Sequence, residues 1–170
     1  MEALDILKLE HSTLLSEVYK LDKQIAFLES SGPIKGRRVL KEIVETSNRM
    51  RDDFTQHTAK EEKDFFPILE SKLGNDKELV KVMKREHDEL ITDLQSLATE
   101  LDRMIMDHDT KRTWNLVSKL QDLKGGLSDH LSKEERVLFW LAEIRLSWLD
   151  QRKIASSLSG ATGVAQSLQP

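Results

Sequence analysis

The chain has 170 residues, a formal net charge of −4 and no cysteine. The lack of cysteine excludes disulfide frameworks, cysteine zinc sites, iron–sulfur clusters and thiol nucleophiles. Only seven glycines and three prolines occur, too few for the many turns of an all-β sandwich or barrel. Charges of both signs are interspersed and no apolar run is long enough to cross a bilayer, so neither nucleic acid nor membrane is expected as a partner.

The first 29 residues carry apolar side chains at helical spacing, including Leu7, Leu14 and Leu21, up to a break at residues 30–33. A second periodic segment follows, and the Gly-Asn-Asp of residues 74–76 ends it with a helix stop and a new N-cap. A third segment runs to a break at residues 107–110, and a fourth continues to about residue 150. This pattern predicts an all-α fold, a four-helix up-down-up-down bundle over residues 1–150.

Both ends of the chain carry further expectations. The N-terminus lacks the basic and apolar regions of a secretory signal, so a cytoplasmic protein is expected. Residues 151–170 are mostly small and polar without periodicity, and this composition predicts a flexible C-terminal tail.

The histidines are distributed one to a helix. Four of the five lie on the apolar stripes of successive segments: His11, His57, His87 and His130. The fifth, His108, falls in the third break, where a solvated turn is expected. One histidine on an apolar face is usually a hydrogen-bonded core residue, but four on four helices favour a shared site.

Two glutamates share those faces. Glu61 and Glu134 each follow a stripe histidine by four residues, so each projects beside it from one side of a helix. A buried carboxylate without a partner is costly by several kcal/mol, so two inward glutamates require cations. The alternative is that they point outward to lysine or arginine, which is the arrangement we expect for Glu62 and Glu135.

Distances along the chain place these residues at one level. His11 lies 22 residues before Pro33, and His57 lies 24 residues after it. Equivalent near-equalities hold for Glu61 and His87 about the second break, and for His87 and His130 about the third. A mismatch of two residues is about 3 Å of helical rise, so the sequence predicts one polar cluster of four histidines and two glutamates.

The ligand types restrict the metal chemistry. Imidazole with carboxylate suits iron, manganese or zinc, and six ligands are too many for one tetrahedral zinc ion. They suit two metals bridged by two carboxylates. The Glu-x-x-His pairs of ferritin-like proteins and the His-Glu-x-x-His of zinc proteases are both absent from the sequence.

These residues resemble the hemerythrin-like HHE cation-binding domains over about residues 1–148. The motifs that carry the resemblance are Glu10-His11, the segment 57–67, Arg85-Glu86-His87 and the segment 130–139. The resemblance implies two iron ions in a non-haem site with an oxo or hydroxo bridge. It also implies terminal ligands His11, His57, His87 and His130, bridging ligands Glu61 and Glu134, and reactivity with dioxygen, peroxide or nitric oxide.

The sequence departs from the oxygen-carrying hemerythrins at two points. The carriers have a further histidine at the position of Met83, and they use His-x4-Asp where this chain has His130-x3-Glu134. These departures favour sensing, scavenging or iron handling over reversible oxygen transport. Two alternatives remain open: a helical interaction module in which the metal is a structural staple, and a peroxidase-like or catalase-like di-iron enzyme.

Overall fold

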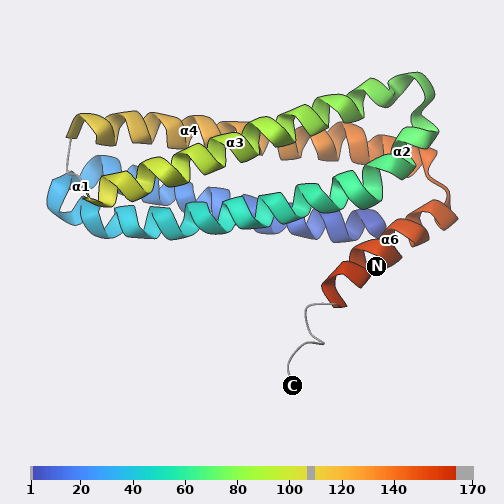
Figure 1. The fold of residues 1–170 in the computed structure, drawn as a ribbon, viewed down its shortest axis with the longest axis horizontal. Coiled ribbons are helices and arrows are strands. Elements are labelled where there is room, and N and C mark those ends of the chain that lie inside the picture. The colour runs from blue at the N-terminus through green and yellow to red at the C-terminus, as the bar shows by residue number, and fades with distance from the viewer. Residues whose placement is uncertain (1, 107–109, 164–170) are drawn as a thin grey trace.

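The computed structural model describes the backbone of residues 2–106 and 110–163, and the side chains of these residues except 32–35, 37, 105–106, 110–114 and 161–163. The described residues form helices and no strand. Four long rods lie side by side in alternating directions, which confirms the predicted all-α four-helix bundle (Figure 1). His108 and most of the third predicted break, residues 107–109, lie outside the described residues.

The first two rods belong to one element, α1 (Ala3–Lys60). The backbone stays helical throughout, but the chain reverses direction near residues 31–38, so α1 has two antiparallel arms (Figure 1). Contacts between the arms follow this reversal: Arg49 lies 3.5 Å from Glu17, and farther from the reversal His57 lies 2.9 Å from Glu10. The first predicted break is therefore a reversal of direction rather than an interruption of helix.

The other rods contain several elements. After α1 come a π-helical segment η1 (Glu61–Phe65), α2 (Phe66–Leu73) and a short 3₁₀ turn η2 (Gly74–Lys77). Gly74 ends α2 with a φ of 56°, a conformation that favours glycine. The third rod is α3 (Glu78–Met106), and the fourth comprises α4 (Thr110–Lys133), a second π-helical segment η3 (Glu134–Phe139) and α5 (Trp140–Arg145).

The C-terminal segment differs from the sequence prediction. Residues expected to be a flexible tail form α6 (Trp148–Gly163), and residues 164–170 lie outside the described residues. Ile154 is fully buried and Leu158 is 1% exposed, because α6 packs against α1 and η1. Ile154 and Leu158, one turn apart, are enough to dock this helix, whereas its large apolar residues Trp148 and Leu149 are exposed. The prediction of a tail was wrong for residues 151–163.

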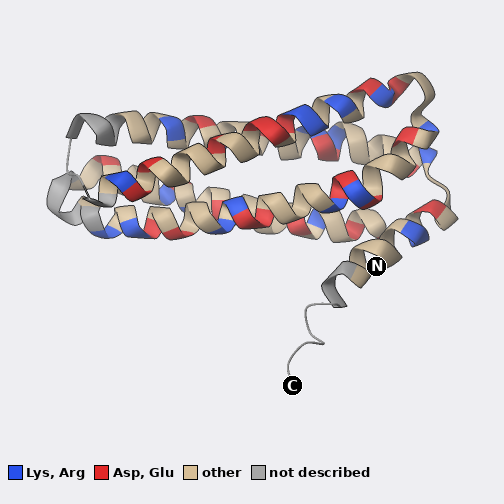
Figure 2. Cartoon of the chain, in the orientation of Figure 1, with Lys and Arg blue, Asp and Glu red and all other residues tan. Residues whose placement is uncertain are grey.

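The buried apolar side chains form two clusters along the bundle. One fills the end where α1 reverses and extends through Phe54, Leu97 and Leu120. The other fills the opposite end and joins Leu7, Phe65 and Phe139 to Ile154 of α6. Charged residues of both signs cover the outer faces of the rods (Figure 2). None of the described helices is long and apolar enough to cross a lipid bilayer.

Candidate metal centre

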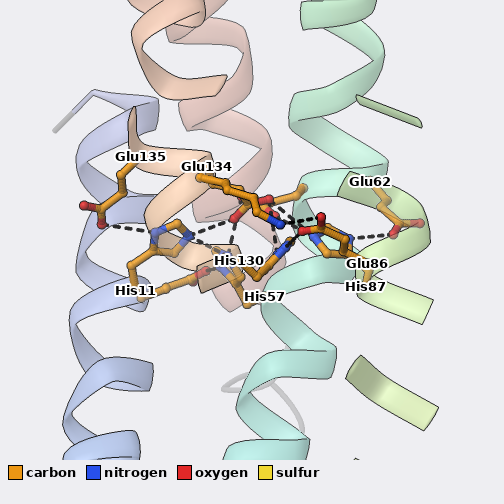
Figure 3. Close-up of polar contacts among 11 residues, drawn as sticks. His11, His57, Glu62, Glu86, His87, His130, Glu134 and Glu135 are labelled. Atoms are coloured by element: carbon orange, nitrogen blue, oxygen red, sulfur yellow. Dashed lines mark hydrogen bonds and ion pairs between the residues drawn. The ribbon is translucent and has the colours of Figure 1, made fainter. Parts of the chain in front are cut away.

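The six predicted ligand residues lie together at one level of the bundle. Their side chains are at most 2% exposed. The first arm of α1 supplies His11, the second arm supplies His57, and α3 supplies His87. The fourth rod supplies both His130 and Glu134, and η1 begins at Glu61. The structure therefore brings together every residue that the sequence placed in the cluster. The histidines and Glu134 are seen in Figure 3.

The four histidines form two pairs, His11 with His57 and His87 with His130. Glu134 lies between these two pairs. One of its carboxylate oxygens, Oε2, lies 3.3 Å from Nε2 of His11. Its other oxygen, Oε1, lies 3.4 Å from Nε2 of His87 and 3.5 Å from Nε2 of His130. Each oxygen thus faces a different pair, which is the arrangement that a bridging ligand requires.

Glu61 spans the two pairs in the same manner. Its Oε1 lies 3.5 Å from Nε2 of His57, and its Oε2 lies 3.4 Å from Nε2 of His87. Two groups of potential donors result, each with its ligand atoms within 4.8 Å of one another. The first group contains His11, His57, Glu61 and Glu134, and the second contains His87, His130 and Glu134.

Each histidine turns its other ring nitrogen toward a second glutamate. Nδ1 of His57 lies 2.9 Å from Glu10, and Nδ1 of His130 lies 3.0 Å from Glu86. A carboxylate only accepts hydrogen bonds, so Nδ1 carries the proton, and Nε2 of a neutral imidazole then has a free lone pair. Burial lowers the pKa of His57 and of His130, which favours this neutral form.

Glu62 and Glu135 contradict one expectation from the sequence. Instead of pairing with lysine or arginine, Glu62 accepts a hydrogen bond from Nδ1 of His87 at 2.8 Å, and Glu135 accepts one from Nδ1 of His11 at 3.2 Å. Both carboxylates are close to 40% exposed. They lie on the rim of the cluster because one residue along a helix turns a side chain by only about 100°.

Several polar atoms at the centre lack hydrogen bonds. Among the described residues, both oxygens of Glu61, Oε2 of Glu134 and Nε2 of His130 are buried without a hydrogen-bond partner. In addition, Nε2 of His11 and Nε2 of His57 lie only 2.9 Å apart, although the Nδ1 contacts leave both with lone pairs. Buried carboxylates and facing lone pairs are unfavourable without a cation, so this donor set fits bound metal ions.

The two central carboxylates have opposite pKa shifts. Burial, and then the nearby Glu134 carboxylate, raise the pKa of Glu61 well above its usual range. Burial alone would also raise the pKa of Glu134, but the contacts with His11 and His87, once these imidazoles also carry a proton on Nε2, outweigh burial and lower that pKa. Hydrogen bonds to Glu134 and Glu62 likewise outweigh burial at His87 and raise its pKa. Without a metal, protons must therefore supply the positive charge that the centre needs.

Aromatic side chains pack around the centre. Phe139 stacks on His11 with ring centroids 5.0 Å apart, and Phe66 stacks on His87 at 5.6 Å. Phe54 makes T-shaped ring contacts with both His87 and His130. The wide π-helical turns η1 and η3 begin at Glu61 and Glu134. Phe66 directly follows η1, and Phe139 is the last residue of η3. Turns of this kind occur frequently at functional sites, but periodicity in the sequence did not predict them.

Comparison with known proteins agrees with this geometry. A family model described as the hemerythrin HHE cation-binding domain matches residues 2–142. A relative from Musicola paradisiaca (strain Ech703), named iron–sulfur cluster repair protein YtfE, is 30% identical over 90 residues. That alignment covers 52% of this chain but 40% of the relative, so the chain matches less than half of that protein's length.

Proposed function

The chain belongs to the hemerythrin HHE cation-binding family, and we propose that it is a non-haem di-iron protein that binds or reacts with dioxygen, peroxide or nitric oxide. The family match establishes a metal-binding domain. The identity of the metal as iron, the number of two and the ligand residues are the proposal. The observation that carries it is the pair of donor groups that share Glu134 and surround oxygens without hydrogen bonds.

The residues would divide the work as follows. His11 and His57 would hold one ion, and His87 and His130 would hold the other. Glu61 and Glu134 would bridge the two, since each turns one oxygen toward each histidine pair. Two anionic bridges suit a pair of divalent or trivalent cations better than neutral ligands would, because they offset charge in a buried site.

Iron at these positions would supply redox chemistry and open coordination positions for a small ligand. Neutral imidazoles and carboxylates are ligands typical of non-haem iron. Phe54, Phe66 and Phe139 keep the surroundings apolar, so a diatomic molecule can approach while bulk water is excluded. The name of the relative, an iron–sulfur cluster repair protein, supports a role in iron handling. The cytoplasmic location expected from the N-terminus stays a prediction.

Elemental analysis tests the proposal directly. Protein expressed with adequate iron and purified without chelators is expected to contain two iron ions per chain. It should also show the near-ultraviolet absorption of a diferric centre, and this absorption should bleach on reduction. One zinc ion and no iron would instead favour the structural staple, and the di-iron proposal would then be wrong.

A further inference from the structure

Four glutamates outside the proposed ligand set each contact one histidine, and the contacts have a common order. The first arm of α1 supplies Glu10, which contacts His57 on the second arm. The second arm continues into η1, whose Glu62 contacts His87 on α3. Each carboxylate therefore lies on the rod that precedes its histidine along the chain.

The remaining two contacts close the circle. Glu86 of α3 contacts His130 of α4, and Glu135 of η3 contacts His11 back on the first arm of α1. Glu10 and Glu86 directly precede His11 and His87 in sequence, yet each contacts a histidine on another rod. Figure 3 shows Glu135 and Glu62 on opposite flanks of the cluster, each joined to its histidine.

Helix geometry explains why the contacts run in one direction. Neighbouring residues are about 100° apart around a helix, and reversing the helix reverses the sense of that rotation when all rods are viewed from one end. On the first and third rods the glutamate comes one residue before the inward histidine. On the second and fourth rods it comes one residue after the inward Glu61 or Glu134. The two offsets, on rods of opposite direction, turn the side chain the same way around the bundle.

Two of these carboxylates are themselves held by lysines. Lys60, three residues after His57, pairs with Glu10, and Lys133, three residues after His130, donates to Glu86 at 2.7 Å. These glutamates are the less exposed two, with side chains 25% and 19% exposed. The lysines restrict the carboxylates and so restrict the imidazoles that the carboxylates orient.

We propose that Glu10, Glu62, Glu86 and Glu135 form a one-directional ring of positioning residues, in which each glutamate sets the tautomer and orientation of the histidine on the next rod. The ring holds the proton of all four histidines on Nδ1 and directs all four Nε2 atoms inward. This inference rests on the proposed metal-binding function. It adds that metal affinity depends on residues that are not ligands, because hydrogen bonds of this kind fix the donor atom.

The test compares two variants in which neighbourhood in sequence and contact in space predict different affected histidines. Glu86 adjoins His87 in sequence but contacts His130, whereas Glu62 contacts His87. In the full chain loaded with Zn²⁺, long-range proton–nitrogen NMR correlations report the tautomer of each histidine. Glu86→Ala is expected to change the signals of His130, and Glu62→Ala those of His87. Each variant should also weaken Zn²⁺ binding by about 10- to 100-fold.

Further variants separate positioning from general loss of structure. Glu86→Gln and Glu62→Gln keep an oxygen that accepts from Nδ1, so they should preserve the wild-type tautomer and recover most of the affinity. Glu143→Ala is the matched control, since Glu143 has a 51% exposed side chain, pairs with Lys8 at 3.0 Å and does not adjoin the centre. It should leave histidine signals and affinity unchanged.

Two results would overturn the ring. One is a change confined to His87 in Glu86→Ala, and the other is a loss of affinity no greater than that of Glu143→Ala. The tautomers are also read in the metal-free chain. A wild-type chain that binds neither Zn²⁺ nor iron would contradict the proposed function. The tautomers of the metal-free variants would still show which glutamate contacts which histidine.

Discussion

The proposed metal centre has two halves with matching sequence offsets. The first half comprises residues 10–11 with 57–66, and the second comprises residues 86–87 with 130–139. In both, a Glu-His pair faces a His-x-x-Lys-Glu-Glu motif, a π-helical turn begins at the first glutamate of that motif, and a phenylalanine lies nine residues after the histidine. Each phenylalanine stacks on a histidine of the other half: Phe66 on His87, and Phe139 on His11.

The surroundings of the halves nevertheless differ. Phe54, three residues before His57, contacts both histidines of the second half, whereas the residue three before His130 is Leu127. Helix α6 packs on η1 through a hydrogen bond from Ser157 to Asp64, and Val137, at the matching position of η3, is 40% exposed. A repeated histidine–glutamate motif therefore does not give the two histidine pairs equivalent surroundings, because residues outside the motif determine what surrounds each pair.

Removal of a bridging glutamate should have the largest effect and should reveal whether the bridges are equivalent. Glu134 lies within 3.5 Å of three histidines and Glu61 of two. We expect Glu134→Ala to lose both metals and Glu61→Ala to retain a fraction of one, because Glu134 faces one histidine more than Glu61 and belongs to both donor groups. Elemental analysis of the purified variants measures this difference, and equal retention would contradict it.

Met83 offers a way to make the halves differ further. It lies four residues before His87, and Leu7 occupies the same position before His11. Both side chains are buried. Met83→His should place an imidazole near the second pair and shift the reduced iron-loaded protein from consuming oxygen toward holding it reversibly, with Leu7→His as the matched variant in the first half.

Stopped-flow absorption after mixing with oxygen distinguishes these behaviours. The expected result is a spectrum that returns to its reduced form under vacuum for Met83→His and not for the wild type. A wild-type protein that already releases oxygen in this way would show that Met83 does not prevent reversible binding.

Helix α6, which packs on η1 of the first half, should contribute measurably to the free energy of unfolding, with a smaller effect than the substitutions at the centre. Ile154 of α6 is fully buried in the cluster that contains Leu7 and Phe65. Ile154→Ala should lower the free energy of unfolding by about 2–5 kcal/mol, the usual cost of such a cavity. Denaturant unfolding measures it, with the exposed Ser156→Ala as control; no change would mean that α6 is not docked in solution.

The smallest expected effect concerns the start of α6. Asp150 accepts hydrogen bonds from the backbone and hydroxyl of Ser147, and these bonds hold the pKa of Asp150 below its ordinary value of 3.8. The folded state therefore binds this proton less readily than the unfolded state, so the contribution is present above pH 3.8 and is lost as the pH falls through the folded-state pKa. Asp150→Ala should lower the melting temperature slightly at pH 7, and the difference should shrink in acid.

Much of the centre is predictable from sequence because it depends on helical geometry alone. The spacing of the histidines from the breaks placed them at one level, and the four-residue interval placed Glu61 beside His57 and Glu134 beside His130. A rise of about 1.5 Å per residue and a fixed angular step make such distances calculable without coordinates. The fold class follows from the same regularity and the family from the resemblance of the histidine and glutamate motifs, and both are confirmed.

Tertiary structure decided what depends on neighbouring rods. Whether Glu62 and Glu135 meet a lysine or a histidine is determined by the side chain that the next rod presents at that level, and here it presents His87 and His11. Docking of α6 likewise depended on an apolar surface formed by α1 and η1, since two buried side chains, Ile154 and Leu158, are too few to produce a recognisable periodicity. Local patterns specify which way a side chain points along its own helix, but its partner is specified by a distant part of the chain.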